Sequence, residues 1–174
     1  MRRPVLLSLL ALPLVGVGVF ATGFGPRALA VVYLAAVTQL LVAFDIREHR
    51  LPNVLVLPGI GCGLVSCAGE WIASGRVPLV PLLAGGAYAT FLLILNLLGG
   101  MGMGDVKLAA ALGLASWTLS VAVLSPVVAF LVGGAVSVVV LTASRGRRGR
   151  RIAFGPFLLG GFWVAVALVA LSRA

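Results

Sequence analysis

Charged residues are rare in this sequence, and acidic ones are especially rare. Only 10% of the 174 residues are charged, and four of them are Asp or Glu. A soluble domain usually has about a quarter of its residues charged, because its surface is hydrated. The composition therefore excludes an ordinary soluble domain.

Residues that bind metals are also scarce. The chain has one histidine, His49, and two cysteines, Cys62 and Cys67. The cysteines are five residues apart, so they share a helix face poorly, and His49 has no partner at ligand spacing. No Cys-x-x-Cys pair occurs. The sequence thus predicts no metal site and no cofactor.

What the chain has in quantity is hydrophobic sequence. Apolar residues make up 61% of it, and the mean hydropathy is +1.21. The apolar runs are too long for core helices and show no strand-like alternation. We expect an all-α fold, a polytopic transmembrane helix bundle of about six to seven spans in a single integral-membrane domain, residues 1–174. The expected spans lie near residues 4–24, 28–44, 53–69, 79–98, 107–124, 126–142 and 153–171.

Two parts of this assignment have alternatives. The first run follows two arginines and has features of a secretory signal peptide, but the next run begins so soon after it that we expect an uncleaved span. The boundary at Ser125–Pro126 separates two runs that alternatively form one kinked helix and a re-entrant piece.

The basic residues predict a topology. The net charge is +9, from 12 arginines and one lysine against the four acids. With the N-terminus in the cytoplasm, ten of the 13 basic residues lie on the inner side, as the positive-inside rule favours. We expect the run Ser144–Arg151 to be a cytoplasmic loop on anionic lipid, and no nucleic acid as a partner. The ten are Arg2, Arg3, Arg47, Arg50, Lys107, Arg145, Arg147, Arg148, Arg150 and Arg151.

Two acidic residues, Asp45 and Asp105, border expected spans. An ionised aspartate costs roughly 2.5–3.5 kcal/mol at mid-bilayer and less near the interface, so its presence there suggests a function. Both preceding spans run from outside to inside, which places the two aspartates at one cytoplasmic level. Two neighbouring carboxyls share a proton, and such a pair activates water in aspartyl proteolysis. The alternative is that each is the first polar residue of a loop, snorkelling or paired with Arg47 or Lys107.

The segment GGMGMGDVKL, residues 99–108, surrounds Asp105 with glycines. Gly102 and Gly104 permit positive φ and close approach of another chain, so this segment suits pairing with an extended peptide. A plain flexible loop is the alternative. Lys107 has three open roles: lowering the pKa of Asp105, orienting a substrate or marking the membrane interface. Glu48 is either a surface charge or a contact for a substrate.

Three segments together resemble the type IV prepilin peptidase family. GMGD, residues 102–105, followed by Val-Lys-Leu, resembles its GxGD motif. FDIREHRLPN, residues 44–53, resembles its other catalytic segment, an aspartate followed by Leu-Pro-Asn. AFGPFLLGG, residues 153–161, is similar to its late Phe-Gly-Pro-Phe segment. The resemblance extends from about residue 34 to residue 161.

This resemblance implies an aspartyl endopeptidase of the bacterial cytoplasmic membrane, with the N-terminus and the active site facing the cytoplasm. Its substrates would be prepilins or pseudopilins, cleaved after a short basic leader. Asp45 and Asp105 match the catalytic pair, Gly102 and Gly104 the motif glycines, and Lys107 the basic position after them. Long members also carry an N-terminal insert with two Cys-x-x-Cys pairs, and many are N-methyltransferases. This chain resembles the short form without that insert, so the resemblance does not extend to methylation.

Three other functions are alternatives to this one. Presenilin-like proteases also use GxGD, but they have Tyr before the first aspartate and a Pro-Ala-Leu segment, whereas this chain has Phe44 and no Pro-Ala-Leu. A small proton-coupled transporter would have acids near mid-membrane and a pair of broken helices in matching halves, whereas here the acids border span ends and no paired halves are found. A non-enzymatic assembly factor for pili or secretion is supported only by abundant glycine.

Overall fold

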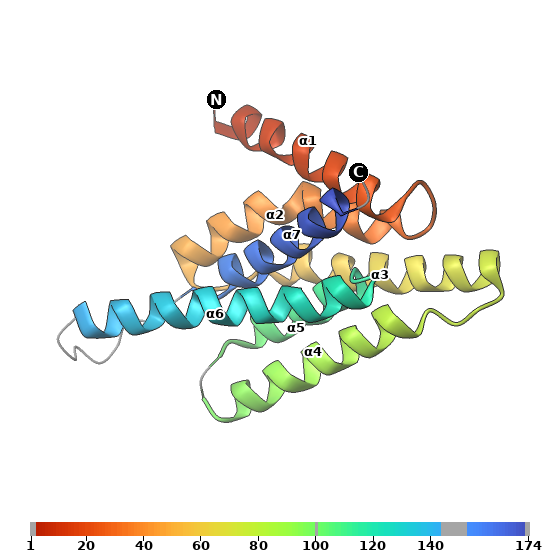
Figure 1. Cartoon of the computed structure of the whole chain (residues 1–174). Coiled ribbons are helices and arrows are strands. Elements are labelled where there is room, and N and C mark those ends of the chain that lie inside the picture. Colours follow the sequence, from red (N-terminus) through yellow and green to blue (C-terminus); the bar gives the residue numbers. More distant parts are fainter. Residues whose placement is uncertain (1–2, 100, 144–152, 173–174) are drawn as a thin grey trace.

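The structure is a computed structural model that describes residues 3–99, 101–143 and 153–172 (Figure 1). The described part of the chain contains seven helices and no strands. The expected loop Ser144–Arg151 lies outside the described residues. The helices are α1 (Arg3–Thr22), α2 (Ala28–Glu48), α3 (Asn53–Ser74), α4 (Leu79–Leu97), α5 (Met103–Leu114), α6 (Leu119–Ala143) and α7 (Gly155–Leu171).

Four helices, α2, α3, α4 and α6, are long and apolar enough to cross a membrane. Two shorter apolar segments accompany them, Ala11–Thr22 of α1 and all of α7. Helix α5 has 12 residues and is about 18 Å long, too short to cross a hydrocarbon core of about 30 Å. The expected all-α membrane bundle is confirmed, and α5 is a short helix inside it.

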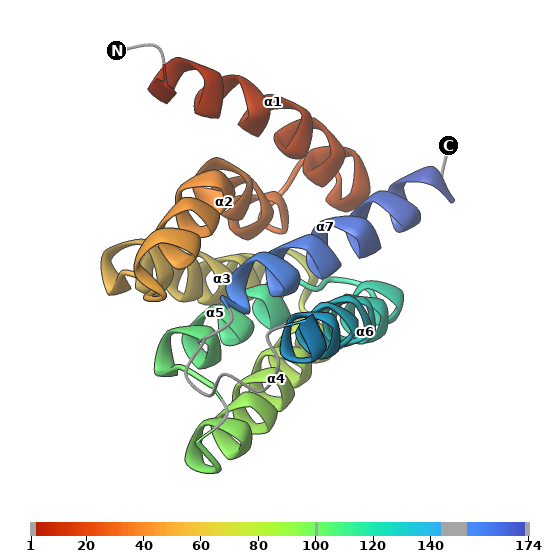
Figure 2. The ribbon, with the colours of Figure 1, turned by 90° about the vertical axis from the view of Figure 1, so that its left-hand side faces the viewer.

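Helix α5 occupies the centre of the bundle. It packs mainly against α4 and α3, and it also contacts α7 and α2. Figure 2 shows α5 enclosed among its neighbours, with α1 on the outside against α2 and α7. Seven of its residues are buried: Val106, Leu108, Ala109, Ala111, Leu112, Gly113 and Leu114. Apolar residues on every side are expected for a helix that is surrounded by other helices.

Small residues bring the two closest helix pairs together. A Cβ on Gly113 of α5 would lie 2.6 Å from the backbone carbonyl of Ala84 in α4. A Cβ on Gly161 of α7 would lie 2.5 Å from the carbonyl oxygen of Ser125 in α6. Membrane helices approach this closely where one of them lacks a side chain, and the packing gained then holds them together.

The helix break after α5 differs from the expected one. It falls at residues 115–118, not at Ser125–Pro126, and α6 continues through Pro126. Thr118 caps the start of α6, because its hydroxyl accepts a hydrogen bond from the Val121 N–H at 3.2 Å. Pro126 has no N–H for the Ala122 carbonyl four residues earlier, and the Tyr88 hydroxyl of α4 donates to that carbonyl instead. The proline is therefore accommodated inside the helix.

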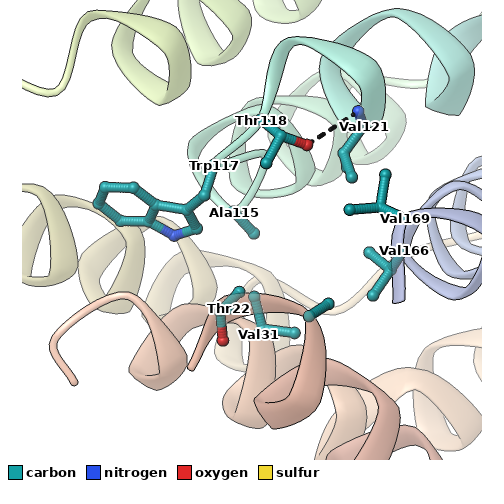
Figure 3. A pocket seen from close by; sticks show the side chains of 9 residues that line it. Thr22, Val31, Ala115, Trp117, Thr118, Val121, Val166 and Val169 are labelled. Carbon is teal, nitrogen blue, oxygen red and sulfur yellow. Dashed lines mark hydrogen bonds between the residues drawn. The ribbon is translucent and has the colours of Figure 1, made fainter. Parts of the chain in front are cut away.

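A small gap lies at the end of the bundle far from Asp45. Its volume is about 10 Å³, at the lower limit for one water molecule. Figure 3 shows its lining, which includes Val31 of α2, Val121 of α6, and Val166 and Val169 of α7. A space of this size and character is a packing defect and does not hold a substrate.

The hydrogen bond from Tyr88 to the Ala122 carbonyl can be tested with a double-mutant cycle. We predict that Tyr88→Phe lowers the free energy of unfolding by about 1–3 kcal/mol, because the carbonyl loses its donor. In a Pro126→Ala background, the new N–H supplies that donor, so Tyr88→Phe should cost less. Denaturant unfolding in detergent measures both costs, and equal costs would contradict this account.

Candidate active site

Three segments far apart in the sequence meet at one end of the bundle. They are the last turn of α2 with the turn that follows it, the first turn of α5, and the first turn of α7. Asp45 and Asp105 both line a cavity of about 350 Å³ between the end of α2 and the start of α5. His49, Arg50, Asn53 and Lys107 line it as well. The cavity is open and large enough to admit water and part of a peptide.

Asp45 lies inside helix α2, not in the loop after it. The helix extends to Glu48 and ends with His49 in the left-handed conformation, at a φ of 51°. The His49 N–H donates to the Asp45 carbonyl at 3.0 Å and closes the helix. Asp45 is therefore on the interior face of the last turn, and it is only 4% exposed.

The first turn of α7 supplies a donor to Asp45. The Gly155 N–H donates a hydrogen bond to Asp45 Oδ2 at 2.8 Å. A Cβ at position 155 would lie 2.7 Å from that same oxygen, so the carboxyl and a larger side chain cannot share this space. Sequence reasoning noted the segment AFGPFLLGG but assigned Gly155 no role. The Gly-Pro at the start of an apolar run was the available signal, because it marks a helix N-terminus.

Asp105 lies in the first turn of α5, which begins after Gly102. Its N–H donates to the Gly102 carbonyl at 3.1 Å. Gly104 lies against Leu51, whose Cβ would be 3.0 Å from a Cβ added there. The close approach of the two segments therefore depends on the motif glycine, and it brings the chain after α2 beside Asp105.

The surroundings of Asp105 favour its protonated form. It lies outside the four helices that are long enough to span the membrane. Burial, and next the nearby Asp45 carboxylate, raise its pKa from 3.8 to about 6, although a hydrogen bond from the Gly102 backbone opposes this. Its Oδ1 is buried and has no hydrogen-bond partner among the described residues. Asp45 and Asp105 are therefore electrostatically coupled.

The basic residues do not pair with these aspartates. Lys107 donates from Nζ to Asn53 Oδ1 at 3.0 Å, which joins α5 to the start of α3. Within the described ranges, the one salt bridge is between Arg27 and Glu70. The alternative that Asp45 and Asp105 are loop residues paired with Arg47 or Lys107 therefore finds no support in the described contacts.

Two other expectations concern Glu48 and metal binding. Glu48 is exposed and is not among the residues that line the cavity, so a contact with a substrate stays a prediction. The described residues hold no group of three or more His, Cys, Asp or Glu side chains placed to bind a metal ion.

The helices and the two-carboxylate cavity define an integral membrane protein with a candidate hydrolytic site. The type IV leader peptidase family matches residues 31–143, which is more than half of the chain. The chain therefore belongs to the type IV leader peptidase family. With its apolar helices, this family membership indicates an integral protein of the inner membrane.

Several curated relatives have the name prepilin leader peptidase/N-methyltransferase. One from Burkholderia pseudomallei is 36% identical over 79% of this chain and 46% of its own length. Others are from Xanthomonas campestris, 32% identical over 91% of this chain and 56% of the relative, and Pseudomonas aeruginosa, 31% identical over 95% and 58%. The chain thus spans about half the length of the curated relatives it matches. No solved structure matches it significantly.

The raised pKa of Asp105 predicts a pH-dependent stability. A carboxyl that binds its proton more tightly in the folded state makes the free energy of unfolding fall as the pH rises from about 4 to about 6. Above that range, Asp105→Asn should stabilise the protein by on the order of 2 kcal/mol, after a discount for partial exposure. The gain should nearly vanish near pH 4.

Thermal unfolding in detergent at about pH 4 and about pH 7.5 measures this difference. Glu48→Gln is the control, because it removes an exposed carboxylate. A gain from Asp105→Asn that is the same at both pH values would contradict the raised pKa.

Proposed function

We propose that this chain is a membrane aspartyl endopeptidase that removes the short basic leader from type IV prepilins or pseudopilins. The observation that carries the proposal is the placement of Asp45 and Asp105 in one open cavity of about 350 Å³. Family membership supports the substrate class, because the matching relatives are named for prepilin leader cleavage. The second activity in their name, N-methylation, is not part of this proposal.

The proposed chemistry needs two carboxyls that hold one proton between them. The ionised carboxylate takes a proton from water, and that water attacks the carbonyl carbon of the scissile peptide bond. The protonated carboxyl donates to the carbonyl oxygen as negative charge develops there. The mutual influence of Asp45 and Asp105 supports this arrangement, because two close carboxylates resist double ionisation.

The segments around the aspartates have the properties that peptide binding requires. Gly102 and Gly104 line the cavity beside Asp105, and a backbone with little side-chain bulk lets an extended peptide approach. Lys107 and Arg50 also line the cavity, so it is not uniformly acidic. We propose that backbone pairing, together with the two carboxyls, positions the leader. Bulk attraction between a basic leader and an acidic surface is not required.

The proposed orientation puts the cavity at the cytoplasmic face. The ends of α2 and α5 that carry Asp45 and Asp105 also carry Arg47, Arg50 and Lys107, and the positive-inside rule places such basic ends in the cytoplasm. A prepilin inserted in the membrane presents its basic leader on that same side. The anionic lipid at that face would neighbour these basic residues.

The proposed reaction predicts that either aspartate is indispensable. Asp45→Asn and Asp105→Asn should each reduce cleavage of a co-expressed prepilin by about 10²-fold or more, because each removes one side of the proton exchange. Glu70→Gln, which changes an acid in the Arg27 salt bridge instead, should cleave like the wild type.

A gel shift and N-terminal sequencing of the pilin measure leader removal, and a membrane fraction blot checks that each variant is inserted. Retained cleavage in both aspartate variants would eliminate the peptidase mechanism. Loss of cleavage in Glu70→Gln at normal abundance would show that the assay does not isolate the cavity.

A further inference from the structure

The two aspartates have unequal surroundings. Gly155, the first residue of the 17-residue helix α7, donates its N–H to Asp45 Oδ2 at 2.8 Å. Backbone N–H groups at a helix N-terminus carry partial positive charge and stabilise a carboxylate. Asp45 thus accepts a charge-assisted hydrogen bond from an element that is otherwise not part of the aspartate segments.

Asp105 is in the opposite position. Its Oδ1 is buried and has no partner within the described part of the chain. A buried carboxylate oxygen without a donor is costly, whereas a carboxylic O–H held there is ready to donate to an incoming acceptor. The Gly102 backbone also interacts with this carboxyl, but it leaves Oδ1 unpartnered.

The remaining charged groups around the cavity do not supply Asp105 with a partner or take the partner of Asp45. Besides the aspartates, they are His49 and Arg50 after α2, and Lys107 from α5. Among the described contacts, none of the three forms an ion pair with Asp45 or Asp105, and Lys107 donates to Asn53. His49 also interacts electrostatically with Asp45, but the hydrogen-bond partners that distinguish the two aspartates are the Gly155 N–H on one side and none for Asp105 Oδ1 on the other.

We propose that the Gly155 N–H holds Asp45 ionised and oriented, so that Asp45 is the general base and Asp105 the general acid. This division of roles rests on the peptidase function proposed above. Gly155 is a positioning residue in this scheme, because it acts through Asp45 and touches no reacting atom.

The proton transfers balance over one cycle. Asp45 takes a proton from water while the water oxygen bonds to the carbonyl carbon, and Asp105 gives its proton to the carbonyl oxygen. The tetrahedral intermediate then collapses: Asp45 gives its proton to the leaving nitrogen, the C–N bond breaks, and Asp105 regains a proton from a hydroxyl as the C=O bond reforms. The products are a carboxylic acid and an amine, and both aspartates return to their starting forms.

Infrared spectroscopy of the purified protein tests which aspartate holds the proton. At about pH 5.5, below the Asp105 pKa of about 6, the wild type should show a protonated-carboxyl band. Asp105→Asn should lose the band. Asp45→Asn should retain it, because burial is the larger cause of the raised Asp105 pKa.

The role of Gly155 is tested with two alanine variants of α7. Gly155→Ala should raise the protonated-carboxyl signal toward about twofold, because its Cβ, 2.7 Å from Asp45 Oδ2, would push the carboxyl away from the backbone N–H that keeps it ionised. Gly160→Ala is the matched control, since a Cβ there meets nothing within 4 Å, and its signal should equal that of the wild type.

Loss of the band in Asp45→Asn with its retention in Asp105→Asn would overturn the assignment, and so would an absent band in the wild type. An unchanged signal in folded Gly155→Ala would overturn the role of Gly155, while the aspartate variants test the assignment even if Gly155→Ala fails to fold. No substrate is needed, so failure of the peptidase function appears separately, as a wild type that cleaves no prepilin.

Discussion

The burial of α5 is the constraint on which the site depends. This helix is too short to cross a membrane. Its position is therefore held by packing against α3, α4 and α7. Enclosure fixes its N-terminal turn, and therefore Asp105, beside the end of α2. Gly113 permits the contact with α4, and Gly104 permits the contact with Leu51. The carboxyl pair is thus a consequence of how a short helix is packed.

The second requirement is access to water next to hydrocarbon. Asp45 is almost fully buried, yet it lines an open cavity with Asp105. Burial raises the pKa of Asp105, and the Gly155 N–H compensates Asp45 for the loss of solvent. The two carboxyls at one cavity thus have different surroundings, and unequal surroundings are the general way in which two carboxyls acquire an acid and a base role.

Much of this arrangement could be predicted from the sequence. The long apolar runs predicted the helices, and the basic residues predicted which helix ends lie together, so Asp45 and Asp105 were expected at one level. The boundary expected at Ser125–Pro126 is wrong, and the structure is closer to the alternative of one longer helix and a separate short piece. The Ala122 carbonyl, which Pro126 leaves without a backbone donor, accepts a hydrogen bond from Tyr88 instead. Tyr88 is 34 residues from Ala122 in the sequence, and no local pattern reveals such a contact.

The hydrogen bond between Gly155 and Asp45 was beyond sequence reasoning for the same reason. The two residues are 110 positions apart, and a backbone donor has no side-chain signature. Lys107 also had several open roles, and its contact with Asn53 depends on how α3 and α5 pack. Local chemistry identified the candidate residues, whereas tertiary packing decided their partners.

The proposed mechanism depends most on the placement of Asp45 and Asp105 at one cavity. Cross-linking tests it directly, with Asp45→Cys and Asp105→Cys in a chain whose own Cys62 and Cys67 are replaced. A short thiol-specific cross-linker should join positions 45 and 105, as seen by mass spectrometry of the linked peptide. The control pair of Asp45→Cys with Glu70→Cys, at opposite ends of the bundle, should stay unlinked. Absence of the 45–105 link, with both cysteines reactive toward a maleimide, would show that the two positions do not lie together.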